Sequence, residues 1–340
     1  MTETVLVTGG TGYVASWCIA TLLERGYRVR TTVRSQAKQD AVRAALPQAL
    51  EPPVQLSFAI ADLTSDEGWD EAVKGIDYVL HVASPLGGEG VTNAEDLIVP
   101  ARDGALRVLR AATEAGVKRV VMTSAANASS PSSYADESVT DETLWTNPED
   151  PKLIPYRKSK TIAEKAAWDF MANQSGRTTL TTILPGAVFG PVLSASTIGS
   201  VEIIARMLRG GMPGTPRIGL EVVDVRDLAD IHLRAMVSPD AAGQRFLATG
   251  EFLWMRDIAQ TLRSGLGTAA AKVPTRNLPD FLVRFTATFL DRSLRPIMPG
   301  LGRRNRHSTE KAFRLLGWKP RPAAETVLAT GESLIQWKVV

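Results

Sequence analysis

The sequence predicts an α/β protein with a doubly wound parallel sheet and a smaller, mostly helical lobe toward the C-terminus. Apolar, strand-like runs alternate with segments of helical spacing through the first half of the 340 residues. A glycine-rich turn joins the first of these runs to the first helix, and Gly and Pro interrupt the alternation after residue 185. Strands that alternate with helices form a parallel sheet covered by helices on both faces.

The elements of the first half follow one another in a regular order. Apolar and β-branched runs predict strands at 4–9, 28–33, 54–60, 78–83, 119–124 and 179–184. Helical spacing predicts helices over 13–25, 95–115 and 157–172. We expect right-handed crossovers between successive strands of the sheet.

The second half is organised differently, because Gly and Pro concentrate in 185–191 and 210–219 and indicate loops there. The elements expected beyond residue 199 are a helix at 200–209, strands near 221–225 and 245–249, a helix at 227–236 and a mostly helical segment over 254–340. Asp227 is expected to have a structural role at the start of its helix. We therefore expect one domain of residues 1–185, joined by 221–250, and a second lobe of 186–220 and 251–340.

The composition is ordinary for a soluble protein, with 44% apolar and 22% charged residues. The 39 basic and 36 acidic residues leave a net charge of +3, which is too small to indicate a nucleic acid or an anionic membrane as partner. The basic run RRNRH at 303–307 is expected to be a solvated face. No stretch of about 18 apolar residues is present, so we expect no membrane-spanning segment.

Cysteine and histidine are scarce in this chain. Cys18 is the single cysteine, so an intrachain disulfide is impossible and a reducing, cytoplasmic location is expected. Three histidines and one cysteine argue against a Cys/His zinc centre, and we predict no metal site. The N-terminus runs directly into a strand pattern without the features of a signal peptide.

The turn TGGTGYVA at residues 8–15 is the first candidate binding element. Glycine permits a tight turn and lets backbone N–H groups approach a pyrophosphate, and the N-terminus of the following helix attracts the same anion. This context, strand then glycines then helix, is that of a Rossmann-type dinucleotide site rather than an ordinary β–α loop. The residues expected to contact the dinucleotide are Gly9, Thr11, Gly12, Tyr13 and Val14.

The end of the second expected strand indicates which dinucleotide binds. An NAD site usually has an Asp or Glu there to hold the ribose 2′-hydroxyl. This sequence has Arg34 instead, with Lys38 one turn further on. Because a guanidinium matches a phosphate bidentately, we predict NADP(H) as the cofactor, with Arg34 and Lys38 at its 2′-phosphate.

Tyr156 and Lys160 are the candidate catalytic pair. Their spacing of four residues places both side chains on one face of the helix that starts here. A free phenol has a pKa of about 10, and a nearby ammonium is expected to lower the pKa of Tyr156. Such a tyrosine gives a proton to a carbonyl oxygen while a nicotinamide delivers hydride to the carbon, and it takes the proton back in the reverse direction.

Seven motifs in order carry a resemblance to a known family. They are TGGTGYVA at 8–15, Asp62-Leu63, HVASP at 81–85, Thr123-Ser124, YRKSK at 156–160, PGAVFGP at 185–191 and VDVRDLA at 223–229. The chain resembles the extended short-chain dehydrogenase/reductase family over essentially its whole length. It is most similar to the group of dihydroflavonol reductases, cinnamoyl-CoA reductases and microbial aldehyde and ketone reductases.

The resemblance implies roles for further residues. The family's Asp-hydrophobe pair at the adenine would be Asp62 and Leu63, and Lys160 would also hold the nicotinamide ribose. The remaining positions implied along the cofactor are Val82, Ala83, Ser84, Thr123, Pro185, Gly186, Ala187 and Val188.

The family's third catalytic group is a hydroxyl after the fifth strand, which hydrogen-bonds the substrate oxygen. Many relatives have two adjacent serines there and use the second, but that position is Ala125 in this chain. We expect Ser124 to take the role. The alternatives are Ser129, Ser130 or Thr123, or a site without this hydroxyl.

The substrate pocket should lie outside the carboxyl ends of the strands. The side chains expected in its walls are Leu86, Ala125, Asn127, Tyr134, Phe189, Met207 and Met212. Most of them are apolar and none is charged, so we expect a small, largely neutral aldehyde or ketone that is reduced reversibly to its alcohol. The apolar members could equally belong to the core.

Three other functions remain open at this point. A nucleotide-sugar epimerase of the same family is one, whereas Ala125 and Ala126 argue against a dehydratase, which would have an acidic residue there. An acyl-CoA reductase is another, in which Arg303, Arg304 and Arg306 would meet the phosphates of coenzyme A. A non-catalytic NADP-binding redox sensor is the third. We expect the protein to be a monomer or a homodimer.

Overall fold

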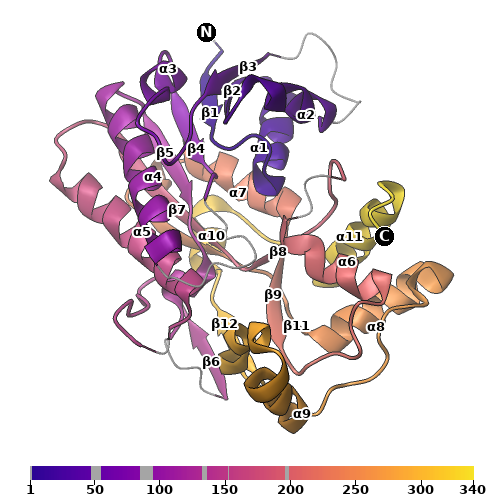
Figure 1. Ribbon diagram of the computed structural model, residues 1–340. Helices are drawn as coiled ribbons and strands as arrows, with labels where there is room; N and C mark the ends of the chain where they lie inside the picture. The colour runs from indigo at the N-terminus through magenta and orange to yellow at the C-terminus, as the bar shows by residue number, and fades with distance from the viewer. Residues whose placement is uncertain (1, 47–54, 85–94, 132–135, 152, 196–198) are drawn as a thin grey trace.

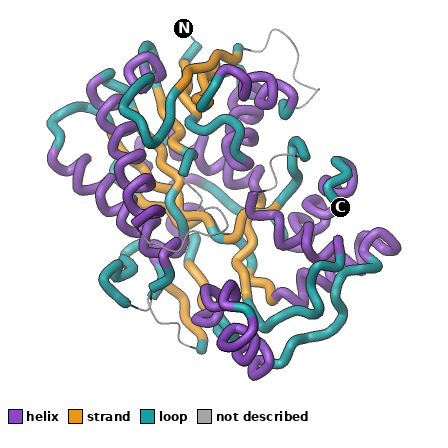
Figure 2. The backbone as a smooth tube through the Cα atoms, in the orientation of Figure 1, coloured by secondary structure: helices purple, strands orange, loops and turns teal. Residues whose placement is uncertain are grey.

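The computed structural model describes residues 2–46, 55–84, 95–131, 136–151, 153–195 and 199–340. A seven-stranded sheet runs through the molecule, and helices enclose it (Figures 1 and 2). Its strands are β1 (Thr4–Val7), β2 (Arg28–Val33), β3 (Leu56–Ile60), β4 (Tyr78–His81), β5 (Arg119–Thr123), β7 (Thr179–Pro185) and β10 (Arg245–Ala248). They are all parallel, in the order β10-β7-β5-β4-β1-β2-β3.

Helices cover both faces of this sheet. On one face α4 (Glu95–Glu114) packs against α5 (Pro155–Asn173), and on the other α1 (Tyr13–Glu24) packs against α7 (Val225–Val237) (Figure 1). Two large apolar cores fill the layers between helices and sheet, and a small third one lies at the turn after β5. The prediction of a doubly wound, Rossmann-type fold is therefore confirmed, including the return of a strand near 245–249 to the sheet.

The strand order reverses between β1 and β4, so the chain leaves β1 toward one edge of the sheet and β4 toward the other. In open parallel sheets a crevice forms at such a point, outside the carboxyl ends of the strands. The shorter helices beside the β2–β3 edge are α2 (Gln39–Ala44) and α3 (Trp69–Val73).

The remaining elements form a second layer beside the sheet. Its helices are α6 (Glu202–Arg209), α8 (Met255–Leu266), α9 (Asp280–Phe285) and α11 (Ala323–Gln336), whereas α10 (Glu310–Leu316) packs against β10 and α7. A three-stranded sheet that the sequence did not reveal lies among them, in the order β11-β9-β8. Its strands are β8 (Ala187–Phe189), β9 (Gly219–Asp224) and β11 (Phe252–Trp254).

Short helical turns connect several of these elements. The 3₁₀ turns are Gln36–Lys38, Ala126–Ser129, Gly199–Val201, Pro239–Ala241, Gly267–Ala270 and Arg292–Gly300, and a π-helical turn covers Thr286–Leu290. Within the described ranges, no helix is both long and apolar enough to cross a bilayer.

The basic run at 303–307 keeps its arginines partly exposed, as a solvated face requires, but it is also a strand and its last residue is buried. Its residues form β12 (Arg304–His307), which pairs in parallel with β6 (Glu137–Thr140). Arg303 forms an ion pair with Asp136, and Arg306 donates to Glu137 at 3.1 Å. The acidic residues that precede and open β6 therefore compensate the charge of the run, and the side chain of His307 is only 7% exposed.

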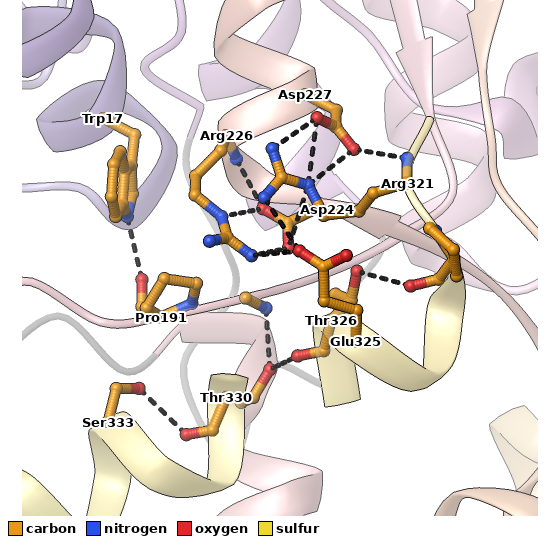
Figure 3. Close-up of polar contacts among 12 residues, drawn as sticks. Trp17, Pro191, Asp224, Arg226, Asp227, Arg321, Glu325, Thr326, Thr330 and Ser333 are labelled. Atoms are coloured by element: carbon orange, nitrogen blue, oxygen red, sulfur yellow. Dashed lines mark hydrogen bonds and ion pairs between the residues drawn. The ribbon is translucent and has the colours of Figure 1, made fainter. Parts of the chain in front are cut away.

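The start of α7 is anchored to α11. Asp224 caps the helix by accepting from the backbone N–H of Arg226 at 2.8 Å, and Asp227 accepts from the Arg321 guanidinium at 2.8 Å (Figure 3). Asp227 thus has the structural role that we expected, but the capping residue is Asp224.

The loop that follows β8 is held by the same C-terminal helix. Thr330 accepts the N–H of Gly190 at 2.7 Å, and Trp17 of α1 donates to the carbonyl of Pro191 at 2.8 Å (Figure 3). The backbone N–H of Val192 donates to Ser333 at 3.0 Å, and its carbonyl accepts from the Trp337 indole at 3.0 Å.

Candidate active site

A cavity of about 990 Å³ opens at the carboxyl ends of β1, β4 and β5 and continues to the segment 297–307. It begins at the turn between β1 and α1. The predicted cofactor residues that line it are Gly9, Thr11, Gly12, Tyr13, Val14, Arg34, Asp62, Leu63, Val82, Ala83, Ser84, Thr123, Pro185, Gly186, Ala187 and Val188. The crevice expected at the reversal of strand order is therefore present, and most of the predicted residues meet in it.

The glycine turn is compact enough to exclude side chains at two positions. Gly9 has a φ of 73°, and a Cβ there would come within 2.8 Å of the Ala83 side chain. A Cβ at Gly10 would come within 2.4 Å of the Thr31 hydroxyl. No side chain caps α1, so its first-turn N–H groups face the turn without intrahelical acceptors. This cradle can hold a pyrophosphate.

Arg34 and Lys38 are not equivalent in the structure. Arg34 lies in the cavity wall beside Asp62, whereas Lys38 is exposed and does not line the cavity. We predicted that both residues meet a 2′-phosphate. Of the two, only Arg34 lies where it could contact a ligand in the cavity. The short 3₁₀ turn Gln36–Lys38 carries Lys38 outward.

Asp62 lines the cavity, and its carboxylate also accepts hydrogen bonds within its own turn. Its carboxylate accepts from the backbone N–H and the hydroxyl of Thr64, both at 2.8 Å. These hydrogen bonds, with a further contribution from the Arg34 charge, lower the pKa of Asp62. The residue combines the structural role of a turn with a position at the expected adenine end.

Tyr156 and Lys160 both come from the first turns of α5, which Pro155 opens at a position that needs no N–H donor. Both side chains line the cavity. The Nζ of Lys160 donates to the hydroxyl of Ser84 at 2.9 Å, and burial lowers the pKa of Lys160 to about 8, against an opposing effect of Glu164. The structure thus brings the predicted pair to the same wall as Ser84.

The pKa of Tyr156 differs from our expectation. Although 37% of the residue is exposed, burial of its hydroxyl raises the pKa of Tyr156, and no compensating effect of Lys160 is found. The expected lowering by a neighbouring ammonium is therefore wrong for this state of the protein, because the Lys160 ammonium is directed to Ser84. The phenol is protonated at neutral pH.

Ser124 lies in the cavity wall, but its hydroxyl points to a buried carboxylate. It donates to Glu164 of α5 at 2.7 Å, and it is 3% exposed. Glu164 also accepts from the hydroxyl of Thr182 at 2.8 Å and from Arg245 at 2.8 Å. Glu164 is a residue that the sequence analysis missed, although it continues the face of α5 that carries Tyr156 and Lys160.

The other candidate hydroxyls also have partners. Thr123 is hydrogen-bonded to His232 at 2.7 Å, and Ser129 donates to the carbonyl of Asp141 at 2.6 Å. Ser130 is hydrogen-bonded to His307 at 2.8 Å. Among these, Thr123 and Ser130 line the cavity together with Ser124, whereas Ser129 does not.

The predicted substrate residues divide into two groups. Ala125 and Asn127 line the cavity. Phe189 and Met207 do not, because both are fully buried in the apolar core, and Met212 packs against that core. These three assignments are wrong, and the alternative that they are core residues holds. Leu86 and Tyr134 lie outside the described residues.

Several further cavity residues had not been named individually as contacts of the carbonyl substrate, although the segments 210–221 and 252–300 were expected to contribute to the walls. They are Ile154, Arg157, Ile218, Leu220, Glu221, Phe252, Ile297, Arg303, Asn305 and His307. Most belong to β9, which the sequence predicted as a strand, and to β11, β12 and the segment before β12, which it did not. Within the described ranges, no cluster of three or more His, Cys, Asp or Glu side chains could hold a metal ion.

Comparison with known proteins agrees with this geometry. The profile of the NAD dependent epimerase/dehydratase family matches residues 5–248. Cinnamoyl-CoA reductase 1 of Petunia hybrida is 35% identical over 263 residues, which are 76% of each chain. The ketoreductase azaE of Aspergillus niger is 32% identical over 299 residues, 83% of this chain and 88% of its own.

Solved structures are similar over the full length. Gre2 of Candida albicans, solved in complex with NADPH, superposes with a TM-score of 0.82 at 29% identity and covers 98% of this chain and 99% of its own. The yeast methylglyoxal/isovaleraldehyde reductase Gre2, also complexed with NADPH, gives a TM-score of 0.81 at 26% identity, with 99% of each chain covered. The chain therefore belongs to the NAD dependent epimerase/dehydratase family, and its relatives include the extended short-chain reductases that its motifs resemble.

Proposed function

We propose that the protein is an NADPH-dependent reductase that converts small, largely neutral aldehydes or ketones into alcohols. The observation that carries this proposal is the position of Tyr156 and Lys160. Both open into the same cavity that begins at the glycine turn, so a dinucleotide held at that turn would extend toward the phenol. The reductases among the relatives, and the NADPH in two similar structures, support the same function.

The residues of the cavity fit NADPH in charge and shape. The turn around Gly9 and Gly10 packs closely on Ala83 and Thr31 and leads into the N-terminus of α1, which no side chain caps, so this helix end suits a pyrophosphate, and Arg34 offers a guanidinium to a 2′-phosphate. Lys160 would hold the nicotinamide ribose, and the strand end 185–188 would flank the ring. When bound, NADPH supplies the hydride that the carbonyl carbon accepts.

Tyr156 would supply the proton. Because its pKa is raised, the phenol is protonated at neutral pH and is ready to donate to the oxygen of a carbonyl undergoing reduction. Lys160, whose pKa is about 8, carries a positive charge on most molecules at neutral pH. This charge is directed to Ser84 at 2.9 Å, so it would position the cofactor rather than lower the pKa of Tyr156.

The wall opposite the glycine turn fits a neutral substrate. Ala125, Ile218, Leu220, Phe252 and Ile297 give it an apolar character. Burial of an apolar or aromatic group against these side chains favours binding, and the carbonyl would be directed toward Tyr156.

The test is the loss of NADPH absorbance with a panel of aryl ketones and aldehydes. We expect turnover with several members of the panel and little with NADH. Measurable binding of NADPH without turnover of any member would contradict the proposal and would favour a redox sensor.

Acyl-CoA reduction is a second candidate, because Arg303 lines the cavity and cinnamoyl-CoA reductases are among the relatives. However, Arg303 is paired with Asp136, and Arg304 and Arg306 with Glu137, so a phosphate would have to compete with these carboxylates. NADPH oxidation with an aromatic acyl-CoA, compared with the corresponding aldehyde, separates the two candidates.

A further inference from the structure

The segment 280–290, formed by α9 and the π-helical turn after it, leaves a cluster of large apolar side chains in solvent. Their exposed fractions lie between 42% and 74%. The rings of Phe285 and Phe289 contact each other, with their centroids 5.1 Å apart. We call this cluster the apolar ridge, and its members are Phe281, Leu282, Phe285, Phe289 and Leu290. The ridge lies at the periphery of the molecule, where α9 projects from its lower end (Figure 1), and the proposed reaction does not use it.

The packing of α9 explains only one of its two apolar faces. Val283 and Ala287, four residues apart, turn inward and are buried. Phe281, Phe285 and Phe289 follow one another at the same spacing and form the outward stripe. A surface helix normally has polar residues on the face opposite the core, and an exposed apolar patch of this kind marks a contact with a protein or a membrane.

The rim of the ridge is positively charged. Arg284 lies three residues from Phe281 and therefore beside it on the helix, and its side chain is exposed. Arg295, which is also exposed, donates to the carbonyl of Ala287 at 3.3 Å, and this contact places it next to the ridge. An arginine can lay its aliphatic stem along an apolar surface while its guanidinium stays in the polar layer above.

The acidic residues at the two ends of the segment do not cancel this charge. Asp280 is paired with Arg217 at 2.5 Å, and Asp291 is also engaged within the protein. The ridge therefore combines aromatic side chains with guanidinium groups at their edge, which is the pattern of a helix that lies in the headgroup region of an anionic bilayer. The net charge of +3 did not indicate such a partner, because it averages over the whole chain.

The size of the ridge argues against a second copy of the chain as its occupant. An aromatic side chain has about 150–250 Å² of surface, so the exposed fractions give the ridge roughly 600 Å². A twofold contact through the ridge would bury about 1,200 Å² at most, which is only the lower end for stable interfaces. Such a contact would also place the arginines of both copies at one interface, where like charges repel. A lipid surface imposes neither limit, and its phosphates complement the arginines.

The ridge is connected to the cavity by the chain that follows it. The turn 292–300 packs against the π-helical turn, and Ile297, Pro299 and Gly300 line the cavity. A membrane bound at the ridge would therefore lie near the apolar wall that the substrate is expected to meet.

We propose that the apolar ridge binds the surface of a bilayer that contains anionic lipids. Phe281, Phe285 and Phe289 enter the boundary between headgroups and acyl chains, while Arg284 and Arg295 contact the phosphates. Lipid binding itself does not depend on the reaction. Only its consequence rests on the proposed function, namely that carbonyl compounds dissolved in the bilayer are a substrate class that reaches the cavity directly.

The experiment is flotation of the full chain with vesicles of phosphatidylcholine and phosphatidylglycerol in equal parts, beside vesicles of phosphatidylcholine alone. We expect the protein to float with the mixed vesicles and to bind the neutral ones at least about tenfold more weakly. The double variant Phe281→Ser with Phe289→Ser should lose at least about tenfold in affinity for the mixed vesicles, because both rings leave the lipid. Arg284→Gln should lose about fivefold on the mixed vesicles and nothing on the neutral ones.

Phe313→Ser is the matched control, because Phe313 lies on α10, outside the ridge, and is 61% exposed. This variant should keep the affinity of the wild type for both kinds of vesicle. Melting curves and NADPH titrations of each variant establish that it is folded.

Absence of the wild type from the floated fraction overturns the inference, as does equal binding by the double variant. A dimer that light scattering detects in the wild type, that the double variant lacks and that no vesicle binding accompanies would assign the ridge to a second copy and overturn it too. The assay needs no turnover, so a failure of the reductase proposal leaves its result intact.

Discussion

At the residue scale, Tyr156 and Lys160 lie four positions apart on one helix and yet occupy different environments. The Tyr156 hydroxyl is protonated and faces the cavity, whereas the Lys160 ammonium is fixed to Ser84 at 2.9 Å. The different roles of the two side chains follow from these different surroundings. The phenol is the group free to transfer a proton, and the ammonium supplies a fixed charge.

Tyr156→Phe removes the proton donor and leaves the glycine turn intact. We expect NADPH affinity to stay within about twofold of the wild type, while kcat falls at least about 10²-fold, the lower end for the loss of a general acid. Steady-state kinetics and a fluorescence titration of NADPH measure the two quantities. Tyr27→Phe, outside the cavity, serves as the control. Near-normal turnover in Tyr156→Phe would mean that another group donates the proton.

Arg34→Asp reverses the charge where a 2′-phosphate is expected. An acidic residue at the end of the second strand holds a ribose 2′-hydroxyl instead, so we expect the preference to shift from NADPH toward NADH. Lys38→Asp makes the same change of charge at an exposed position off the cavity and should leave the preference in place. The ratio of kcat/KM for the two cofactors is the measurement. If only Lys38→Asp changed it, the phosphate contact would lie at Lys38.

At the element scale, α5 connects the candidate catalytic residues to the sheet. Glu164 on this helix binds Ser124 after β5, Thr182 in β7 and Arg245 in β10. Arg245 also stacks on the Trp145 ring at 3.5 Å. A single buried carboxylate thus fixes the helix against three strands, which sets the position of the turn that carries Tyr156.

Glu164→Gln leaves Arg245 buried without its counter-charge. Breaking a buried ion pair by removing one partner costs about 3–5 kcal/mol, and we expect a loss of that size in the free energy of unfolding. Chemical denaturation followed by circular dichroism measures it. Asp169→Asn, an exposed position on the same helix, should change the stability by no more than about 0.5 kcal/mol. A loss below about 1 kcal/mol in Glu164→Gln would show that the pair does not hold α5.

The elements that the sequence predicted correctly are those with a local signal. The glycine turn, β1 and α1 follow directly from adjacent residues, and so does the pairing of Tyr156 with Lys160 on one face of α5. β12 could not be predicted, because Arg304–His307 has no apolar alternation and becomes a strand only by pairing with β6. The Ser130–His307 and His307–Glu221 contacts span 177 and 86 residues, and no pattern in the sequence joins such positions.

The assignment of Phe189 and Met207 to the pocket failed for a related reason. Both are apolar residues near predicted loops, and hydrophobicity does not distinguish a cavity wall from a core. Three-dimensional packing places them at about 1% and 0% exposure.

At the scale of the whole molecule, the cavity lies between the seven-stranded sheet and the second layer. Residues from the glycine turn, α5, β9, β11 and the segment before β12 line it together. A ligand that bridges these parts binds only the folded chain and stabilises it by mass action.

NADPH should therefore raise the melting temperature. At a concentration 100-fold above its Kd, a ligand adds about 2.7 kcal/mol to the stability of the folded state, which corresponds to a rise of a few degrees. Differential scanning fluorimetry measures the shift, and NADH at the same concentration should give a smaller one. Equal shifts with both cofactors would contradict the role of Arg34.

Side chains of α11 and the residue after it form hydrogen bonds with the loop 190–192. These contacts determine how much of the chain must be present for folding. The family profile ends at residue 248, but a truncation there would remove Thr330, Ser333 and Trp337. The backbone groups of Gly190 and Val192 would then lose their partners, directly after the strand end that flanks the expected nicotinamide position. A boundary drawn from sequence similarity alone would thus cut these contacts, and mutagenesis libraries or split-protein designs should keep residues 323–337 in the same polypeptide.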